Sequence, residues 1–169
     1  PAYNAFGIEF DRNTFFYTEK VTPPGGSSEV QLDGIKRYTF LQGGSLGRVW
    51  LPYDDSDVTF SIAKNQTLNT SSSFSDGLEV SSGHLSIMGG NFTSTNASPQ
   101  DEDSAVNIRS HGSLLADVDN FTAVSGSESS LKIMSEYSFP VTVRIRAMEN
   151  FRLLSGGTGL AMESSDDGG

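Results

Sequence analysis

Alternating triplets, apolar at their first and third positions, recur along the second half of the chain. They are Leu78-Glu79-Val80, Val106-Asn107-Ile108, Leu131-Lys132-Ile133 and Leu160-Ala161-Met162. The first residues of these triplets lie 28, 25 and 29 positions apart. Because successive side chains of a strand point to opposite faces, each triplet predicts a short strand with one buried face.

A second marker keeps nearly the same spacing. The dipeptide Asn-Phe occurs at residues 91–92, 120–121 and 150–151, with spacings of 29 and 30. Two markers with one period are typical of a solenoid or an array. A repeat of about 29 residues would hold three strands of five to six residues and their turns.

The strand pattern resembles that of the right-handed parallel β-helix, the architecture of pectate-lyase-like proteins. The chain lacks segments with the 3.6-residue period that helical repeats need. The resemblance covers roughly residues 56–169 and implies an all-β fold with about four coils. Since it depends on period and strand pattern, it implies a fold and no activity.

The repeated Asn and Phe have a structural interpretation in such a coil. Asn tolerates the backbone conformation of a sharp bend, and stacked Asn amides can bond to one another from coil to coil. The Phe after each Asn would point inward and stack on its equivalents. We therefore predict a structural ladder; the alternative is a ligand-binding role. The ladder residues are Asn91, Asn120, Asn150, Phe92, Phe121 and Phe151.

Residues 1–55 differ in pattern from the rest. Alternation occurs at residues 5–10 and 29–32, and glycine- and proline-rich turns separate further short apolar segments. Aromatic residues are dense here: Phe6, Phe10, Phe15, Phe16, Tyr17, Tyr38, Phe40 and Trp50. We expect residues 1–55 to form a small β-region that either caps the solenoid or docks the protein onto another surface, and residues 56–169 to form the parallel β-helix.

Composition and charge narrow the classes of partner. With 11 basic and 21 acidic residues the chain has a net charge of −10, which repels nucleic-acid phosphate and anionic membrane surfaces. No apolar run approaches the roughly 18 residues of a membrane span. The chain has no cysteine, so disulfides and thiolate chemistry are excluded. The first residues lack the basic and apolar regions of a signal peptide.

Candidate chemistry is sparse, and we expect no enzyme, no cofactor and no metal. The histidines, His84 and His111, are interpreted as solvent-facing turn residues at one corner of neighbouring coils. Asp119 and Glu149 could form a carboxylate pair across two coils, as glycoside hydrolysis needs, but a solvated strand face accounts for them. The acidic stretches 54–57 and 101–103 offer oxygen ligands without the spacing of a calcium-binding loop.

These observations favour a non-enzymatic structural protein of a virus particle. Short β-solenoids preceded by a small β-region resemble bacteriophage capsid-decoration and tail-spike modules, which are usually homotrimers. We therefore expect a homo-oligomer located in the virion, and we favour a trimer over a dimer. Its residues 1–55 would dock onto other virion proteins such as a capsid or tail protein. The alternatives are an extracellular adhesin or polysaccharide-binding module and, less favoured, a polysaccharide lyase or hydrolase.

Overall fold

The computed structural model describes residues 29–100, 102–127, 129–136 and 139–165. All regular elements in these ranges are strands, and none of the described residues forms a helix that could cross a membrane. The strands are β1 (Glu29–Gln31), β2 (Ile35–Phe40), β3 (Gly44–Ser45), β4 (Arg48–Leu51), β5 (Asp57–Ser72), β6 (Leu78–Val80), β7 (His84–Asn96), β8 (Ser104–Arg109), β9 (Ser113–Ser125), β10 (Ser129–Glu136), β11 (Thr142–Ser155) and β12 (Thr158–Ser165).

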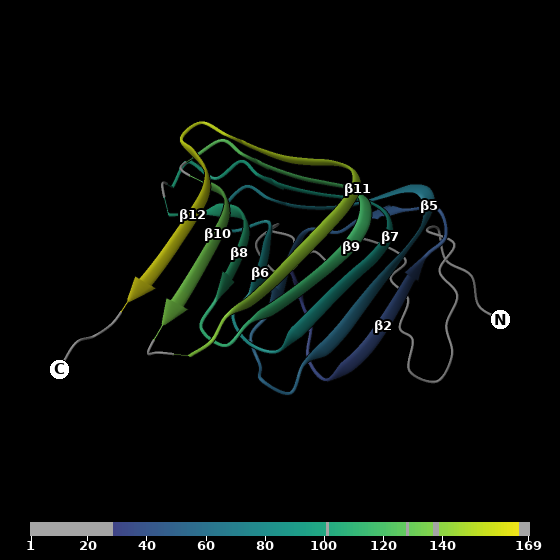
Figure 1. The fold of residues 1–169 in the computed structure, drawn as a ribbon, viewed down its shortest axis with the longest axis horizontal. Helices are drawn as coiled ribbons and strands as arrows, with labels where there is room; N and C mark the ends of the chain where they lie inside the picture. Colours follow the sequence, from purple (N-terminus) through teal and green to yellow (C-terminus); the bar gives the residue numbers. More distant parts are fainter. Residues whose placement is uncertain (1–28, 101, 128, 137–138, 166–169) are drawn as a thin grey trace.

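The chain winds repeatedly between two parallel sheets (Figure 1). One sheet has the order β1-β4-β6-β8-β10-β12, and the other β11-β9-β7-β5-β2 with β3 also paired to β5. Each long strand of the second sheet bends once, so that one coil has three sides. The molecule is therefore an all-β parallel solenoid of about four turns, which confirms the expected fold class.

The alternating triplets stack on one another in the first sheet. Leu78 pairs with Val106, Val106 with Leu131, and Leu131 with Leu160. A shift by one residue would turn the apolar side chains of a strand to its other face, so the apolar pattern fixes this register. The prediction made from the triplets is confirmed.

The stacking extends back into the region before residue 56. Strand β2 pairs with β5 in parallel, and β4 pairs with β6. Residues 29–51 therefore supply strands to the same two sheets, and the expected boundary at residue 55 lies just after β4. The alternating segment at residues 5–10 lies outside the described residues.

The coils differ most in length at the bend of the long strands. Four residues separate Ile62 from Thr67 in β5, whereas Gly90 alone separates their partners Gly89 and Asn91 in β7. Gly89 has φ +104°, and a Cβ there would stand 2.0 Å from the Ile62 carbonyl oxygen. The longer bend of β5 thus lies so close to β7 that only glycine fits beneath it.

A smaller irregularity in β11 explains the second Asn-Phe spacing. Ala147 pairs with Val118 and Asn150 with Asn120, so Met148 and Glu149 share the position opposite Asp119. This bulge adds one residue, and the spacing rises from 29 to 30.

The core is a narrow apolar column, completed by buried hydroxyls in one corner. Phe40, Phe60, Phe92 and Phe121 are its largest fully buried side chains. In the corner between the sheets, Thr70 Oγ1 donates to Ser94 Oγ at 2.8 Å, and Ser94 Oγ donates to the Ala105 carbonyl at 2.5 Å. Since these hydroxyls are hydrogen-bonded, they fill the corner without an unpaired polar atom, which helps a chain with 36% hydrophobic residues to form a core.

Candidate functional site

The three repeated asparagines lie in one column at the bend. Asn120 Nδ2 donates to Asn91 Oδ1 at 2.8 Å, and Asn150 Nδ2 donates to Asn120 Oδ1 at 2.7 Å. Asn91 Nδ2 lies 3.5 Å from Thr67 Oγ1 in the preceding coil. The amides are thus engaged with each other, an arrangement that holds the bends in register.

The phenylalanines form a parallel column on the inside of the same bend. The ring centroid of Phe121 lies 5.4 Å from that of Phe92 and 5.6 Å from that of Phe151. Phe92 and Phe121 are fully buried, whereas Phe151, in the last long strand, is 51% exposed. The stack is therefore covered on one side and open on the other.

Of the two carboxylates considered for glycoside hydrolysis, Asp119 and Glu149, the second has another contact. Glu149 Oε2 accepts a hydrogen bond from Asn120 Nδ2 at 2.9 Å, beside the bulge that faces Asp119. Asp117 Oδ1 lies 3.7 Å from Arg146 Nε. Glu149 is thus held by the ladder, which supports a structural reading of this carboxylate.

The two histidines have different surroundings. His84 opens β7, with Nδ1 2.9 Å from Ser113 Oγ and Nε2 3.0 Å from Ser86 Oγ. A Ser-His-acid triad needs a carboxylate on the second ring nitrogen, and here that nitrogen meets a hydroxyl. His111 lies in the turn before β9, with its ring 3.8 Å from that of Phe139 and Nδ1 3.6 Å from Asp54 Oδ1.

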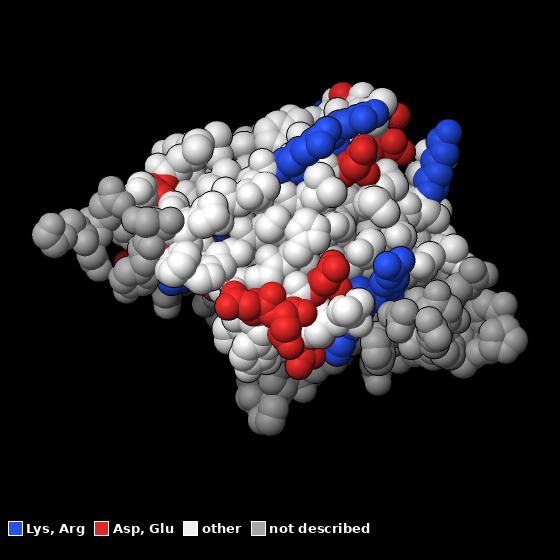
Figure 2. All heavy atoms as spheres, turned by 60° about the horizontal axis from the view of Figure 1, so that its bottom comes forward, with Lys and Arg blue, Asp and Glu red and all other residues white. Residues whose placement is uncertain are grey.

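Acidic side chains do not converge on a metal position in the described part of the chain. No three His, Asp or Glu side chains there lie close enough to share an ion. On the face shown in Figure 2, charged side chains gather in two areas: basic and acidic side chains lie next to one another above, and an acidic cluster with basic side chains beside it lies below, with mostly uncharged surface between the two areas. The charged side chains are therefore distributed unevenly over this face.

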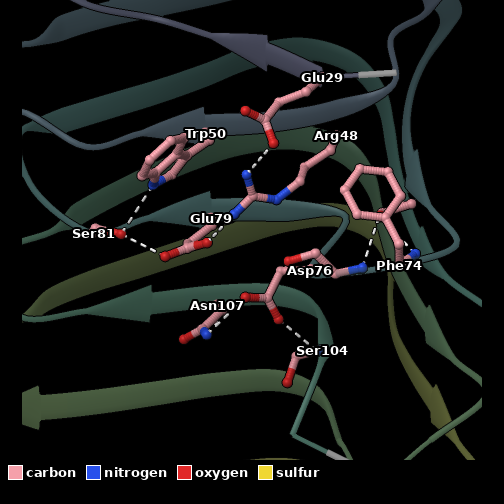
Figure 3. Close-up of polar contacts among 11 residues, drawn as sticks. Glu29, Arg48, Trp50, Phe74, Asp76, Glu79, Ser81, Ser104 and Asn107 are labelled. Atoms are coloured by element: carbon pink, nitrogen blue, oxygen red, sulfur yellow. Dashed lines mark hydrogen bonds and ion pairs between the residues drawn. The ribbon is translucent and has the colours of Figure 1, made fainter. Parts of the chain in front are cut away.

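A buried ionic cluster, which the sequence did not reveal, joins three strands of the first sheet (Figure 3). The Arg48 guanidinium in β4 donates to Glu29 Oε2 at 2.6 Å and to Glu79 in β6. Ser81 Oγ donates to Glu79 Oε1 at 2.5 Å and accepts from Trp50 Nε1 at 3.2 Å. Arg48 is 7% exposed and Glu79 8%, so the cluster ties three coils together away from water.

A second buried carboxylate lies beside this cluster (Figure 3). Asp76 Oδ1 accepts from the Ser104 backbone N–H at 2.6 Å, and Oδ2 accepts from Asn107 Nδ2 at 3.0 Å. Burial raises the pKa of Asp76 to about 6, with smaller contributions from the charges of Glu79 and Asp103, while both hydrogen bonds act in the opposite direction. Asp76 thus fastens the turn before β6 to the next coil.

The last coil exposes apolar side chains that earlier coils bury. Phe121 and Leu114 in β9 are fully buried, whereas their partners in β11, Phe151 and Val143, are exposed and half-buried. Met162 in β12 is 72% exposed. These side chains, with Ile145, Leu153 and Leu160, form the open end of the solenoid.

A hollow lies at the edge of this open end. It has a volume of about 340 Å³ and is lined by Ile133, Ser135, Val141, Met162, Glu163 and Ser164. Its walls come from β10, β12 and the segment before β11. Among the features described above, the open end leaves its apolar side chains the most exposed in the described part of the chain.

The described residues thus define a parallel β-solenoid of about four turns with an open end at its last coil. Comparison of the chain with models of protein families, with curated proteins and with solved structures found no match. Any functional assignment must therefore start from the geometry of the solenoid itself.

Proposed function

We propose that the protein is a non-enzymatic structural component of a virus particle, as a capsid-decoration or tail-spike protein of a bacteriophage. The observation that carries this proposal is the open end. Phe151, Leu160 and Met162 are each about half exposed or more. Apolar surface of this kind next to unpaired strand edges is typical of an interaction site or an aggregation hazard. A subunit inside a particle has such a surface covered by its neighbours.

The proposed oligomer is a homotrimer that docks onto a capsid or tail protein through residues 1–55. The resemblance to phage decoration and tail-spike modules supports this arrangement, as do the aromatic residues Phe6, Phe10, Phe15, Phe16 and Tyr17 in the sequence. Tyr38 and Phe40 do not contribute to it, because they are buried in the core of the solenoid. Aromatic side chains bury large areas and are enriched at interfaces.

The contacts of the polar side chains support a structural role. Glu149 is held by Asn120, and both ring nitrogens of His84 meet serine hydroxyls. The contacts of Glu149 with Asn120 and of His84 with Ser113 join adjacent coils and so hold them in register. The proposal therefore assigns no residue to catalysis.

An antibody raised against the purified chain tests the proposal. It is applied to particles concentrated from cultures of the source organism after phage induction, and bound antibody is located by immuno-electron microscopy. Labelling of capsids or tails at regular positions is expected. Labelling of cell surfaces or secreted material, with bare particles, would contradict the proposal.

A second candidate is a secreted adhesin or polysaccharide-binding module. Tyr53 and Phe139 are 52% and 43% exposed, and Phe139 packs on His111 near Asp54. Exposed aromatic rings can stack on sugar rings. Binding of the chain to a glycan array, lost in a Tyr53→Ala, Phe139→Ala variant and kept in a Phe74→Ala control, would favour this candidate.

A further inference from the structure

The open end presents strand β11 with an unpaired edge. This strand pairs with β9 on one side and is the last strand of its sheet. No described residue pairs with its outer edge. An edge of this kind can accept a further strand through main-chain hydrogen bonds. The side chains along β11 therefore specify which strand would fit there.

The inward side chains of β11 require apolar neighbours. Val143, Ile145, Ala147 and Leu153 are only partly buried, and Phe151 is 51% exposed. The residues that pair with them in β9 are almost completely buried, because β11 covers them. A strand that covers β11 in the same way must carry apolar side chains at alternate positions.

The outward side chains of β11 favour an acidic partner. Arg144, Arg146 and Arg152 are exposed on this strand, so three of the 11 basic residues of the chain lie on it. Arg146 lies 3.7 Å from Asp117 of the preceding coil, whereas the residues that pair with the other two arginines in β9 are uncharged. Because unlike charges on adjacent strands attract, a strand with carboxylates above these arginines is favoured.

The asparagine column ends at the same edge with an acceptor. Asn150 donates to Asn120, and none of the described side chains donates to Oδ1 of Asn150. A strand that continues the column would place a side-chain donor, such as another asparagine amide, above this oxygen. The edge of β11 thus has three requirements: apolar, acidic and donor side chains at fixed positions.

The described strands of a second copy do not meet these requirements. Stacked on β11 in the register of the coils, β2 would set Arg37 beside Arg144. Gly43 occupies the asparagine position of that first coil and has no side chain to donate. A second β11 in antiparallel orientation would set arginine near arginine. Contact between copies at this end therefore relies on the apolar side chains alone.

We propose that the open end is an acceptor site for a β-strand of another protein, which adds along β11 in the direction of the other strands of its sheet. The partner strand has apolar side chains at alternate positions, carboxylates over Arg144 and Arg152, and an amide donor over Asn150. Charge complementarity selects this partner over a second copy of the chain. The inference goes beyond the proposed function, because it concerns which strand the edge accepts in any assembly.

A synthetic peptide tests the site directly. The probe has the sequence of β9, residues 113–125, because that strand already fits β11 from the other side. Its changes Leu115→Glu and Thr122→Glu place carboxylates over Arg144 and Arg152. The full chain is titrated into fluorescein-labelled peptide, and fluorescence anisotropy measures binding. Saturable binding of one peptide per chain is expected.

The control peptide has the same composition and the opposite alternation. The residues at positions 114, 116 and 118 are each exchanged with the residue that follows, so that carboxylates face the apolar column. This peptide should bind at least about tenfold more weakly. Equal binding of the two peptides would overturn the proposal. No binding of the matched peptide would also overturn it, in favour of an end covered by this chain itself or by a second copy.

A charge exchange tests the register. Arg144→Glu in the full chain should weaken binding of the acidic peptide about tenfold, and a peptide with Leu115→Arg in place of Leu115→Glu should restore it. The matched control is Arg37→Glu, in the same column of the first coil, which should leave the affinity unchanged. Equal losses in the two variants, or no restoration, would overturn the assigned pairing. The antibody experiment on virus particles is unaffected by either outcome, so the two proposals fail separately.

Discussion

Phe121 shows how one side chain secures a coil. It is fully buried between Phe92 and Phe151 and lies directly inside the asparagine bend. Replacement by alanine would leave a cavity that the stacked coils cannot close by moving together, because their spacing is fixed by main-chain hydrogen bonds.

We predict that Phe121→Ala lowers the free energy of unfolding by about 3–5 kcal/mol, the range for a core phenylalanine. Urea denaturation followed by circular dichroism measures the change. Phe151→Ala is the matched control, since its ring is 51% exposed and should cost clearly less. Equal losses at the two positions would contradict the burial difference.

Asp76 gives a prediction for pH. Its folded pKa of about 6 lies above the ordinary value of 3.8, so the folded state holds the proton more tightly. The contribution of Asp76 to the free energy of unfolding is therefore complete below about pH 4 and is lost as the pH rises through 6. The difference between the two limits is about 3 kcal/mol.

In Asp76→Asn this loss should disappear. The amide keeps an oxygen for the Ser104 N–H and offers a donor to Asn107, whose buried Oδ1 has no partner among the described residues. We expect the variant to gain stability relative to the natural chain between pH 4 and pH 7.5. Urea titrations at both values measure it, and a difference that stays constant with pH would contradict the assignment.

Among the strands, the Arg48 cluster connects β1, β4 and β6 through side chains. The guanidinium lies between Glu29 and Glu79, with its Cζ 5.0 Å from the centroid of the Trp50 ring. Removing one partner of a buried ion pair costs more than the pair itself contributes, because the remaining charges stay buried.

Arg48→Ala should therefore lower the free energy of unfolding by about 3–5 kcal/mol. Arg37→Ala, which removes an exposed arginine from β2, should change it by no more than about 0.5 kcal/mol. Thermal unfolding of both variants, compared with the natural chain, provides the measurement. Similar losses in both would show that the cluster is solvated.

The sequence predicted those strands whose residues repeat from coil to coil. Asn120 and Phe121 have counterparts of the same type in two other coils, so the repeat alone aligned them. In the coil before Asn91 the equivalent pair is Thr67 and Leu68, and a longer bend precedes them. The long strand of that coil lacks the Asn-Phe marker, so the repeat did not align it with the others.

The buried ionic cluster was missed for a related reason. Trp50, Glu79 and Asn107 occupy one column of the sheet, but they differ in type, so no repeat signals their contact. Their interaction depends on the register of strands about 30 residues apart, and that register follows from the apolar neighbours on the other face.

At the scale of the whole molecule, the acidic surface and the apolar open end have opposite effects on association between copies of the chain. Acidic side chains outnumber basic ones by 21 to 11 and favour solubility, while the open end favours association. If copies associate through folded ends, the associated state stabilises the native fold by mass action.

We therefore predict that the apparent Tm rises by several degrees when the protein concentration increases about a hundredfold. Differential scanning calorimetry at low and high concentration measures the shift. Met162→Lys, which places a charge at the 72% exposed position, should reduce it. An identical Tm at both concentrations would contradict association through the open end.

The asparagine column has a consequence for how solenoids can be joined. Asn91, Asn120 and Asn150 each direct Nδ2 toward a side-chain oxygen of the preceding coil. Asn91 and Asn120 also accept, through Oδ1, a hydrogen bond from the asparagine of the following coil. Their amide dipoles therefore add along the axis, with the oxygen end at the last coil. Two solenoids meeting last coil to last coil would set oxygen against oxygen. The column thus gives the stack of coils a polarity. The addition of a further coil that donates hydrogen bonds to this column is favoured at the last coil only.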